Sequence, residues 1–398
     1  MNNINKGKSP FYPGQPVPVE FFIGRQNEIE RIIRATAQVE MGKPQAVFLI
    51  GEYGIGKSSL ASYMRYYAEK TNHLLGLHVL LGGASTIEEM TAKILETALK
   101  SEAYESKFTE KIRKLLSSYI DSIGLFGVTI KMDAIKADSP NISQGLIPFF
   151  SELLKRLADD GAKGIMLILD EINGITNNPK FAHFIKSLID ENAISSNPLP
   201  LMLMLCGVDE RRSEMIQHHR PIERIFDIVE IEPMSKGEMH DFFSKAFESI
   251  NAQVENDAMD RICHFSAGFP KIMHIIGDAI YWIDKDGRIS LEDASEGLFI
   301  ATEDIGRKFV DQQIFKALRS KDYHSILSKL AKEKFDLSFK KSTIEKGLSQ
   351  MEKRKFTNFL QRMKRLNVIK SGEERGEYIF NNRMIRFYIF LESLRKSS

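Results

Sequence analysis

The stretch Gly51-Glu-Tyr-Gly-Ile-Gly-Lys-Ser58 has the spacing G-x-x-x-x-G-K-[ST] that is typical of a phosphate-binding loop. An apolar run, residues 46–50, precedes it, and an amphipathic segment that begins at Ser59 follows it. A buried strand, a glycine-rich loop and the start of a helix are the structural context that such a loop requires. The sequence therefore predicts that the chain binds a nucleoside triphosphate.

In this loop the backbone carries much of the binding, because successive N–H groups and the positive end of a helix can surround a polyphosphate. We expect the side chain of Lys57 to reach the β- and γ-phosphates and the hydroxyl of Ser58 to hold Mg²⁺. The other predicted nucleotide contacts in this stretch are Gly51, Gly54, Ile55, Gly56 and Ser59.

A second chemical feature is the pair Asp170-Glu171, which follows the apolar residues 165–169. The end of a buried parallel strand places such carboxylates at the sheet edge where nucleotides bind. We expect Asp170 to hold Mg²⁺, through water, and Glu171 to act as the general base that polarises the attacking water. The alternative is a strand that ends in a solvated acidic turn, and the phosphate-binding loop about 110 residues upstream favours the catalytic interpretation.

Two further segments are candidate nucleotide contacts. Ile23 and Gly24 lie in an apolar turn upstream of the loop, where they could cover a purine base or simply pack the start of a helix. Pro270 and Lys271 follow Gly268 at the start of a predicted helix, which is the expected use of proline. Lys271 could reach the phosphates or remain an exposed lysine, and the sequence leaves both pairs of alternatives open.

Arg224 lies in a polar segment near the end of the α/β pattern. A guanidinium there could reach the nucleotide of a neighbouring subunit as an arginine finger. It could equally form a surface ion pair, and the sequence does not decide between the two.

The composition is that of an ordinary globular protein, with 398 residues, 43% of them hydrophobic and 27% charged. No apolar run approaches the roughly 18 residues of a membrane helix, and the first residues show no secretory signal. Cys206 and Cys263 lie in apolar segments, far from any metal-ligand spacing. We therefore expect a cytoplasmic protein with buried thiols and no membrane partner.

The pattern of elements predicts an α/β fold with several parts. Apolar strands alternate with amphipathic helices, which indicates a mostly parallel sheet covered by helices on both faces. The expected parts are an extended lead-in at 1–19, a core at 20–234, a helical lid without strands at 235–304 and a basic domain at 305–398. Residues 123–132 suggest a hairpin within an insertion at 118–140, to which we assign no function.

The C-terminal domain carries a concentrated positive charge. Residues 305–398 contain 23 Lys and Arg against 10 Asp and Glu, a net charge of +13. Because the whole chain has a net charge of +2, the preceding 304 residues have a net charge of −11. Such a balance suggests a polyanionic partner. The predicted order of helices, then a two-stranded ribbon and a final helix, is that of a winged helix-turn-helix.

The third helix of this domain is the candidate DNA-binding element. Arg, Asn and Gln on an exposed recognition helix suit phosphates and base edges. The candidate contacts are Lys355, Asn358, Gln361, Arg362 and Arg365. Two acidic residues of the predicted wing, Glu373 and Glu374, oppose this interpretation, and winged helices also dock proteins.

The ordered set of motifs resembles the AAA+ and STAND class of P-loop ATPases, over about residues 20–300. Origin-recognition-type initiators and transposition-regulator ATPases are the most similar groups. The matching segments are Phe22-Ile-Gly-Arg25, residues 51–58, Leu169-Asp-Glu171, Arg224-Ile-Phe226 and Gly268-Phe-Pro-Lys271. The resemblance implies that Ile23 and Gly24 contact adenine, so that ATP is the nucleotide, and that Lys271 takes the place of a sensor arginine. It also implies a winged helix after the lid.

Two departures from that resemblance concern the rate of hydrolysis. The strand that ends at Gly207 lacks the usual Asn or Thr, and Asp209 is the nearby polar residue. A lysine at position 271 keeps the charge of arginine but loses its bidentate fork. We therefore expect a slow ATPase that works as a switch, assembles into a homo-oligomer with ATP and engages DNA. The alternative is a nucleotide-gated module whose winged helix docks a protein.

Overall fold

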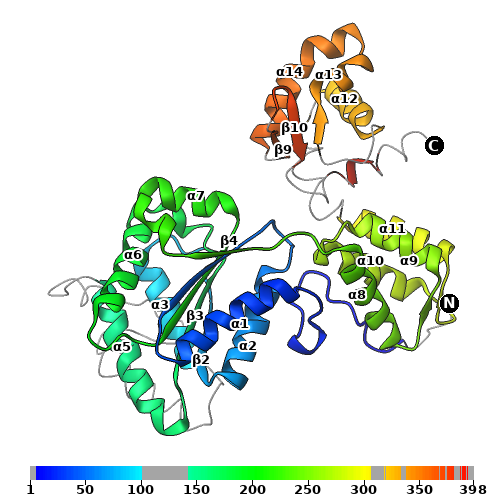
Figure 1. Cartoon of the computed structure of the whole chain (residues 1–398). Coiled ribbons are helices and arrows are strands. Elements are labelled where there is room, and N and C mark those ends of the chain that lie inside the picture. The colour runs from blue at the N-terminus through cyan, green and yellow to red at the C-terminus, as the bar shows by residue number, and fades with distance from the viewer. Residues whose placement is uncertain are drawn as a thin grey trace. The chain divides into compact units, whose positions relative to one another are not determined.

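The computed structural model divides into two compact units, Pro16–Glu232 and Met1–Gln15 together with Pro233–Ser398 (Figure 1). The residues described are 6–100, 142–305, 318, 320–332, 338–366, 368–372, 374–380, 386, 388–390 and 392. The insertion predicted at 118–140 lies outside them. Within them, no helix combines the length and apolar character needed to cross a membrane.

The core of the first unit is a five-stranded sheet whose strands are all parallel. Its order is β2 (Leu74–Leu80), β3 (Gly164–Asp170), β4 (Leu201–Gly207), β1 (Gln45–Ile50) and β5 (Asp227–Glu230). Every residue of β3 and β4 is buried, which explains why both strands are apolar except for Asp170 at the end of β3. Ile50 pairs with Gly207 and Leu80 with Asp170, so the strands end together at one edge. The predicted α/β fold is confirmed.

Helices cover both faces of this sheet (Figure 1). One face carries α1 (Gln26–Glu40) and α2 (Lys57–Thr71), and the other carries α3 (Ile87–Lys100), α5 (Ile142–Leu157) and α6 (Pro179–Ile194). The second face buries a continuous apolar core that includes Phe150, Phe181 and Leu203. Because both faces are covered, polar chemistry is confined to the ends of the strands.

Residues 233–305 of the second unit form four helices with a small sheet that the sequence did not predict. The helices are α8 (Lys236–Glu248), α9 (Asn256–Ser266), α10 (Pro270–Ile283) and α11 (Leu291–Ile305). Two strands, β6 (Gln253–Val254) and β7 (Arg288–Ile289), pair in parallel between them. The expectation of a lid without strands is therefore wrong, since two-residue strands are too short to show any alternation.

Residues 6–15 pack on these helices as an extended strap. The ring of Phe11 is buried against Phe242, Phe243 and Phe247 of α8. A Cβ at Gly277 of α10 would lie 2.2 Å from that ring, so only glycine leaves it room. Residues 6–15 of the predicted lead-in are thus a packed part of the helical unit.

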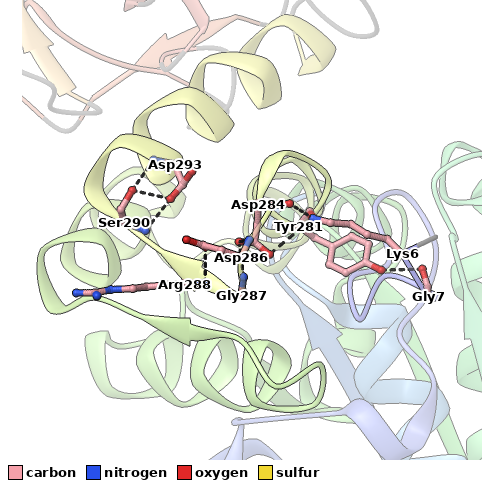
Figure 2. Close-up of polar contacts among 9 residues, drawn as sticks. All are labelled: Lys6, Gly7, Tyr281, Asp284, Asp286, Gly287, Arg288, Ser290 and Asp293. Atoms are coloured by element: carbon pink, nitrogen blue, oxygen red, sulfur yellow. Dashed lines mark hydrogen bonds and ion pairs between the residues drawn. The ribbon is translucent and has the colours of Figure 1, made fainter. Parts of the chain in front are cut away.

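The beginning of the strap caps the end of α10 (Figure 2). The amine of Lys6 donates to the carbonyls of Tyr281 and Asp284, and the Tyr281 hydroxyl donates to the Gly7 carbonyl at 2.7 Å. The carboxylate of Asp284 in turn accepts the Gly287 N–H at 3.0 Å. A cation at a helix C-terminus satisfies free carbonyls and complements the helix dipole.

The C-terminal part of the second unit combines helices with an antiparallel sheet. Its elements are α12 (Lys321–Lys332), β8 (Ser338–Lys340), α13 (Lys341–Lys346), α14 (Gln350–Arg365), β9 (Ile369–Ser371) and β10 (Glu377–Phe380). The sheet order is β8-β10-β9. The predicted ribbon therefore has a third strand, β8, which the sequence did not reveal because it runs into α13 without a turn residue.

Candidate functional site

The loop at residues 51–58 joins β1 to α2 as its motif predicts. Gly54 and Gly56 have φ of +79° and +101°, in the left-handed region that glycine adopts freely. A Cβ on Gly51 would lie 2.9 Å from the carbonyl oxygen of Ile231. The backbone geometry thus requires glycine at each of these three positions. The loop leads directly into the N-terminus of α2.

Lys57 is folded over this loop. Its amine donates to the carbonyls of Gly51 at 2.8 Å and Glu52 at 2.9 Å, and lies 5.6 Å from the ring centre of Tyr53. Burial lowers the pKa of Lys57, and the carboxylate of Asp170 is among the groups that oppose this shift. A cation held across a glycine-rich loop fits a polyphosphate.

Asp170 is the most constrained charged group of the site. It ends β3 and is 2% exposed. Its Oδ1 accepts the Glu171 N–H at 2.8 Å, and its Oδ2 lies 3.1 Å from Nε2 of His78. Burial acts to raise the pKa of Asp170, but hydrogen bonds from His78 and Ser58 outweigh it and hold the pKa below its usual value. The carboxyl group is therefore ionised at neutral pH.

The contact between Ser58 and Asp170 brings the two predicted metal ligands together. A hydroxyl and a carboxylate at the mouth of a phosphate-binding loop fit Mg²⁺, which takes few protein ligands and completes its shell with phosphate and water. Among the described residues there is no group of three or more His, Cys, Asp or Glu side chains that could hold a metal by themselves. The donor set suits a nucleotide-bound magnesium ion.

Glu171 stands in an unusual conformation at the same edge. Its φ is +57°, a left-handed value that is uncommon for a residue with a side chain. Its carboxylate lies over Gly82, where an added Cβ would be 2.5 Å from Oε2. The amine of Lys93 donates to the Gly82 carbonyl at 2.9 Å and so anchors this turn. The backbone of this candidate general base is thus left-handed, and the glycine beside it leaves room for its carboxylate.

The thiol of Cys206 lies in β4 beside this site and is fully buried. Burial raises its pKa well above the usual value. The group is therefore a neutral thiol and no nucleophile, and the prediction of a buried, unpaired cysteine is confirmed for it and for Cys263.

Arg25 is a residue to which the sequence analysis gave no role. It is 5% exposed, its Nη2 donates to the Ile55 carbonyl at 3.0 Å, and its Nη1 donates to the Glu232 carbonyl. A buried guanidinium of this kind ties the backbone of the phosphate-binding loop to the end of the first unit. The only signal in the sequence is that Arg25 ends the segment Phe22-Ile-Gly-Arg25.

The segment before α1 packs on the helix that follows the loop. Gly24 has a φ of +80°, and the neighbouring Phe22 ring stacks on Tyr63 of α2 at 4.8 Å. The hydroxyl of Ser59 accepts the Val17 N–H at 3.3 Å. Ile23 therefore lies in a segment next to α2, and its contact with adenine stays a prediction.

The remaining predicted residues are Arg224 and the pair Pro270 and Lys271. Arg224 ends η5 (Arg220–Arg224), is exposed, and has no hydrogen bond or ion pair within the described parts of the chain. Pro270 and Lys271 form the first turn of α10 in the other unit. Their roles toward a nucleotide stay predictions.

Comparison with known proteins agrees with this geometry. Residues 22–207 match the family model of the AAA ATPase domain. A Walker-type ATPase of Pyrococcus abyssi shares the fold with a TM-score of 0.59 and 15% identity, over 93% of this chain and 96% of that one. The ORC2 protein of Aeropyrum pernix, in its ADPNP–ADP complexes, shares the fold with a TM-score of 0.57 and 11% identity, over 98% of this chain and 97% of that one. No curated protein matches the sequence.

The loop, the parallel sheet and the Asp170-Glu171 pair together define a P-loop nucleoside triphosphatase. Residues 22–207 resemble the AAA ATPase domain, and the chain is an ATP-binding ATPase. The predicted likeness to origin-recognition-type ATPases is confirmed for the fold.

Proposed function

We propose that this protein is a slow ATPase that switches conformation with ATP, assembles with further copies of itself and engages DNA through its C-terminal part. The observation that carries the DNA proposal is α14. One side of this helix buries Phe356, Phe359 and Met363, and its other side exposes cations and amides. An amphipathic helix of this kind packs through its apolar side and exposes a positively charged side to solvent.

In the nucleotide site each residue has one task. The loop N–H groups and Lys57 bind the phosphates, and Ser58 and Asp170 would hold Mg²⁺, which supplies charge neutralisation to the phosphates when it is bound. The Glu171 carboxylate accepts a proton from the attacking water. Its place next to Asp170 at the end of β3 supports this role, because a general base must lie within hydrogen-bond reach of its water.

The end of β4 supports slow turnover. Val208 follows Gly207 and is buried, so it offers no side-chain donor for a γ-phosphate. The carboxylate of Asp209 is exposed and lies 3.7 Å from Arg212. Without a donor from this strand, the charge that develops during hydrolysis is less stabilised.

The C-terminal part has the element order of a winged helix, α12-β8-α13-α14-β9-β10, with α14 as its third helix. Arg354, Asn358, Gln361, Arg362 and Arg365 are exposed and have no partner among the described residues. Such groups are available to phosphates and base edges. Lys355 differs, because its amine pairs with Asp322 of α12.

Pairing also weakens the main objection to DNA binding. The Glu374 carboxylate lies 2.7 Å from the amine of Lys340, and this hydrogen bond lowers the pKa of Glu374. The amine of Lys364 donates to the Ser371 hydroxyl and lies 5.1 Å from the Tyr378 ring centre, so α14 and the ribbon form one surface. The negative charge of Glu374 is thus partly balanced on that surface.

The exposed guanidinium of Arg224 supports assembly. It lies at the end of η5 without a partner in the described chain, and is therefore free to reach another molecule. In a homo-oligomer it would act as an arginine finger on the neighbour's nucleotide.

The second candidate is a nucleotide-gated module that docks a protein. Met351 favours it, because this apolar side chain is 60% exposed in the first turn of α14. Such a surface has a mixed apolar and basic character that suits an acidic protein as well as DNA.

The test is binding of the full chain to a labelled DNA duplex at several salt concentrations. We expect affinity to fall steeply with salt, and the double variant Arg362→Gln/Arg365→Gln to bind more weakly with a shallower salt dependence. The control Lys43→Gln/Lys285→Gln removes two exposed charges elsewhere and should match the parent. No binding to DNA, or equal losses in both double variants, would favour protein docking instead.

A further inference from the structure

We infer that His78 is a positioning residue for Asp170: it holds the carboxylate in the orientation that serves Mg²⁺ and thereby sets the magnesium requirement of nucleotide binding. This inference rests on the proposed role of Asp170 in holding Mg²⁺. No motif includes His78, which lies in the apolar strand β2, and its partner is 92 residues away in the sequence.

The contact itself has a defined direction. Nε2 of His78 lies 3.1 Å from Oδ2 of Asp170. One carboxylate oxygen accepts the Glu171 N–H, and a carboxylate has only acceptor oxygens to offer the ring. The imidazole therefore carries a proton on Nε2 and donates it to Oδ2.

The neighbouring elements explain how an imidazole reaches this position. Gly76 is two residues before His78 and so shares its face of β2. A Cβ on Gly76 would lie 2.4 Å from Cγ of Arg65 and from Oε1 of Glu69, both in α2. The helix therefore packs closely on that face, and its first turn, which contains Ser58, lies toward the end of the strands where His78 meets Asp170.

Both oxygens of the carboxylate are held. Oδ1 accepts the Glu171 N–H at 2.8 Å, and Oδ2 accepts from His78. Two donors on opposite oxygens fix the carboxylate plane about its terminal bond, which is otherwise a soft torsion. If the His78 donor is removed, a carboxylate that is only 2% exposed loses a hydrogen bond that water cannot readily replace.

The functional consequence concerns the metal. A carboxylate that acts on Mg²⁺ must keep its orientation while the nucleotide and its ion enter and leave. Loss of an outer partner of this kind typically costs 10–100-fold in metal affinity. Replacement of His78 should therefore change the magnesium dependence of nucleotide binding. It should leave nucleotide binding in the absence of metal unaltered.

The experiment measures binding of a fluorescent ATP analogue to the full chain as a function of free Mg²⁺ and in EDTA. All variants are made in the Glu171→Gln background, so that turnover does not contribute. His78→Gln keeps a donor near the place of Nε2, whereas the shorter amide of His78→Asn does not reach Asp170. We expect His78→Asn to raise the half-saturating Mg²⁺ concentration about 10–100-fold and His78→Gln to stay near the parent.

Three results would overturn the inference: a parental magnesium curve for His78→Asn, equal shifts for both variants, or an equal loss of binding in EDTA. Asp170→Asn separates this inference from the proposal beneath it. If Asp170→Asn leaves the magnesium requirement unchanged, Asp170 does not serve the metal and both ideas fail. If Asp170→Asn shifts the curve and His78→Asn does not, only the role of His78 fails. The double variant should shift the curve no further than Asp170→Asn alone.

Discussion

The nucleotide site and the outer face of α14 are both suited to phosphate, but they hold their charges in opposite ways. Asp170 and Arg25 are 2% and 5% exposed and have several hydrogen-bond partners each. Arg362 and Arg365 are exposed and have no partner among the described residues. A buried, fully bonded charge is fixed in place, whereas an exposed one adjusts to its ligand. We therefore expect single substitutions to be severe in the site and mild on α14.

The largest effect is expected for Lys57→Ala. This change removes the cation that lies across the loop, together with its contacts to Gly51 and Glu52. We expect turnover to fall by at least about 100-fold and nucleotide affinity to be lost or strongly reduced. Phosphate release and binding of a fluorescent ATP analogue measure the two effects, with the exposed Lys43→Ala as the matched control. A turnover number near that of the parent would show that Lys57 and its loop do not take part in hydrolysis.

Glu171→Gln should separate binding from chemistry. The amide keeps the shape of the carboxylate over Gly82 but cannot accept a proton from water. We expect nucleotide affinity to remain and the turnover number to fall by about 10²–10⁴-fold. Single-turnover phosphate release in parallel with equilibrium binding gives the answer, and an unchanged turnover number would exclude Glu171 as the base.

Gly82→Ala tests whether the position of the Glu171 carboxylate affects the rate of hydrolysis. The backbone of Gly82 does not have a positive φ, and the atom that a methyl group meets is the movable end of Glu171. The protein should therefore fold, with its carboxylate displaced by a fraction of the methyl group's size. We expect turnover to fall by about 10–100-fold, since small misplacements of a reacting group are costly.

A cycle with Glu171→Gln shows whether Gly82→Ala acts through that residue. In the Glu171→Gln background, Gly82→Ala should cause no further loss of turnover. An additional loss of the same size would mean that the methyl group disturbs something else. Thermal unfolding of both variants serves as the control for folding.

These residues also show what sequence can and cannot predict. The loop and the Asp170-Glu171 pair are contiguous motifs next to apolar strands, so local pattern was sufficient for both. Gly82 and His78 contribute through the register of β2 on β3, where Leu80 pairs with Asp170. Contacts across strands that are far apart in the sequence leave no local pattern.

Short elements were missed for a related reason. The strands β6 and β7 have two residues each, and β8 has three, so none reaches the four or more alternating residues that indicate a strand in a sequence. The prolines and glycines predict an extended lead-in at 1–19, of which 6–15 form the strap. Its anchor, Phe11, depends on the space left by Gly277, which is more than 260 residues away.

Glu352 is the exception on α14, because one end of this helix is built like the nucleotide site. Its carboxylate is buried, completes the capping box with Ser349, and accepts from Ser325 and Lys329 at 2.6 Å each. Burial acts to raise the pKa of Glu352, but these hydrogen bonds outweigh it and lower the pKa to about 2. The folded state therefore holds this proton less tightly than the unfolded chain.

The stability that Glu352 supplies is present above its unfolded pKa and is lost as the pH falls through about 4.5 toward about 2. Glu352→Gln should remove this part of the pH dependence and cost on the order of 1 kcal/mol at neutral pH, because the amide can keep the capping box but loses the charge-assisted bond from Lys329. Thermal unfolding followed at several pH values measures both. A Glu352→Gln variant that keeps the parental acid dependence would show that another group is responsible.

The smallest expected effect is on DNA binding, and it is tested by replacing two cations of the same helix separately. Arg362→Gln and Lys355→Gln each remove one positive charge from α14, but Lys355 already pairs with Asp322 whereas Arg362 is free within the described chain. If α14 contacts DNA, Arg362→Gln should lower affinity and reduce the salt slope by about 1, as expected for one lost phosphate contact. Lys355→Gln should change the salt slope less and instead affect thermal stability slightly, because it breaks the link between α12 and α14. Equal salt slopes for the two variants would mean that the ion pair does not withdraw Lys355 from the binding surface, and that exposure rather than pairing determines which cations act.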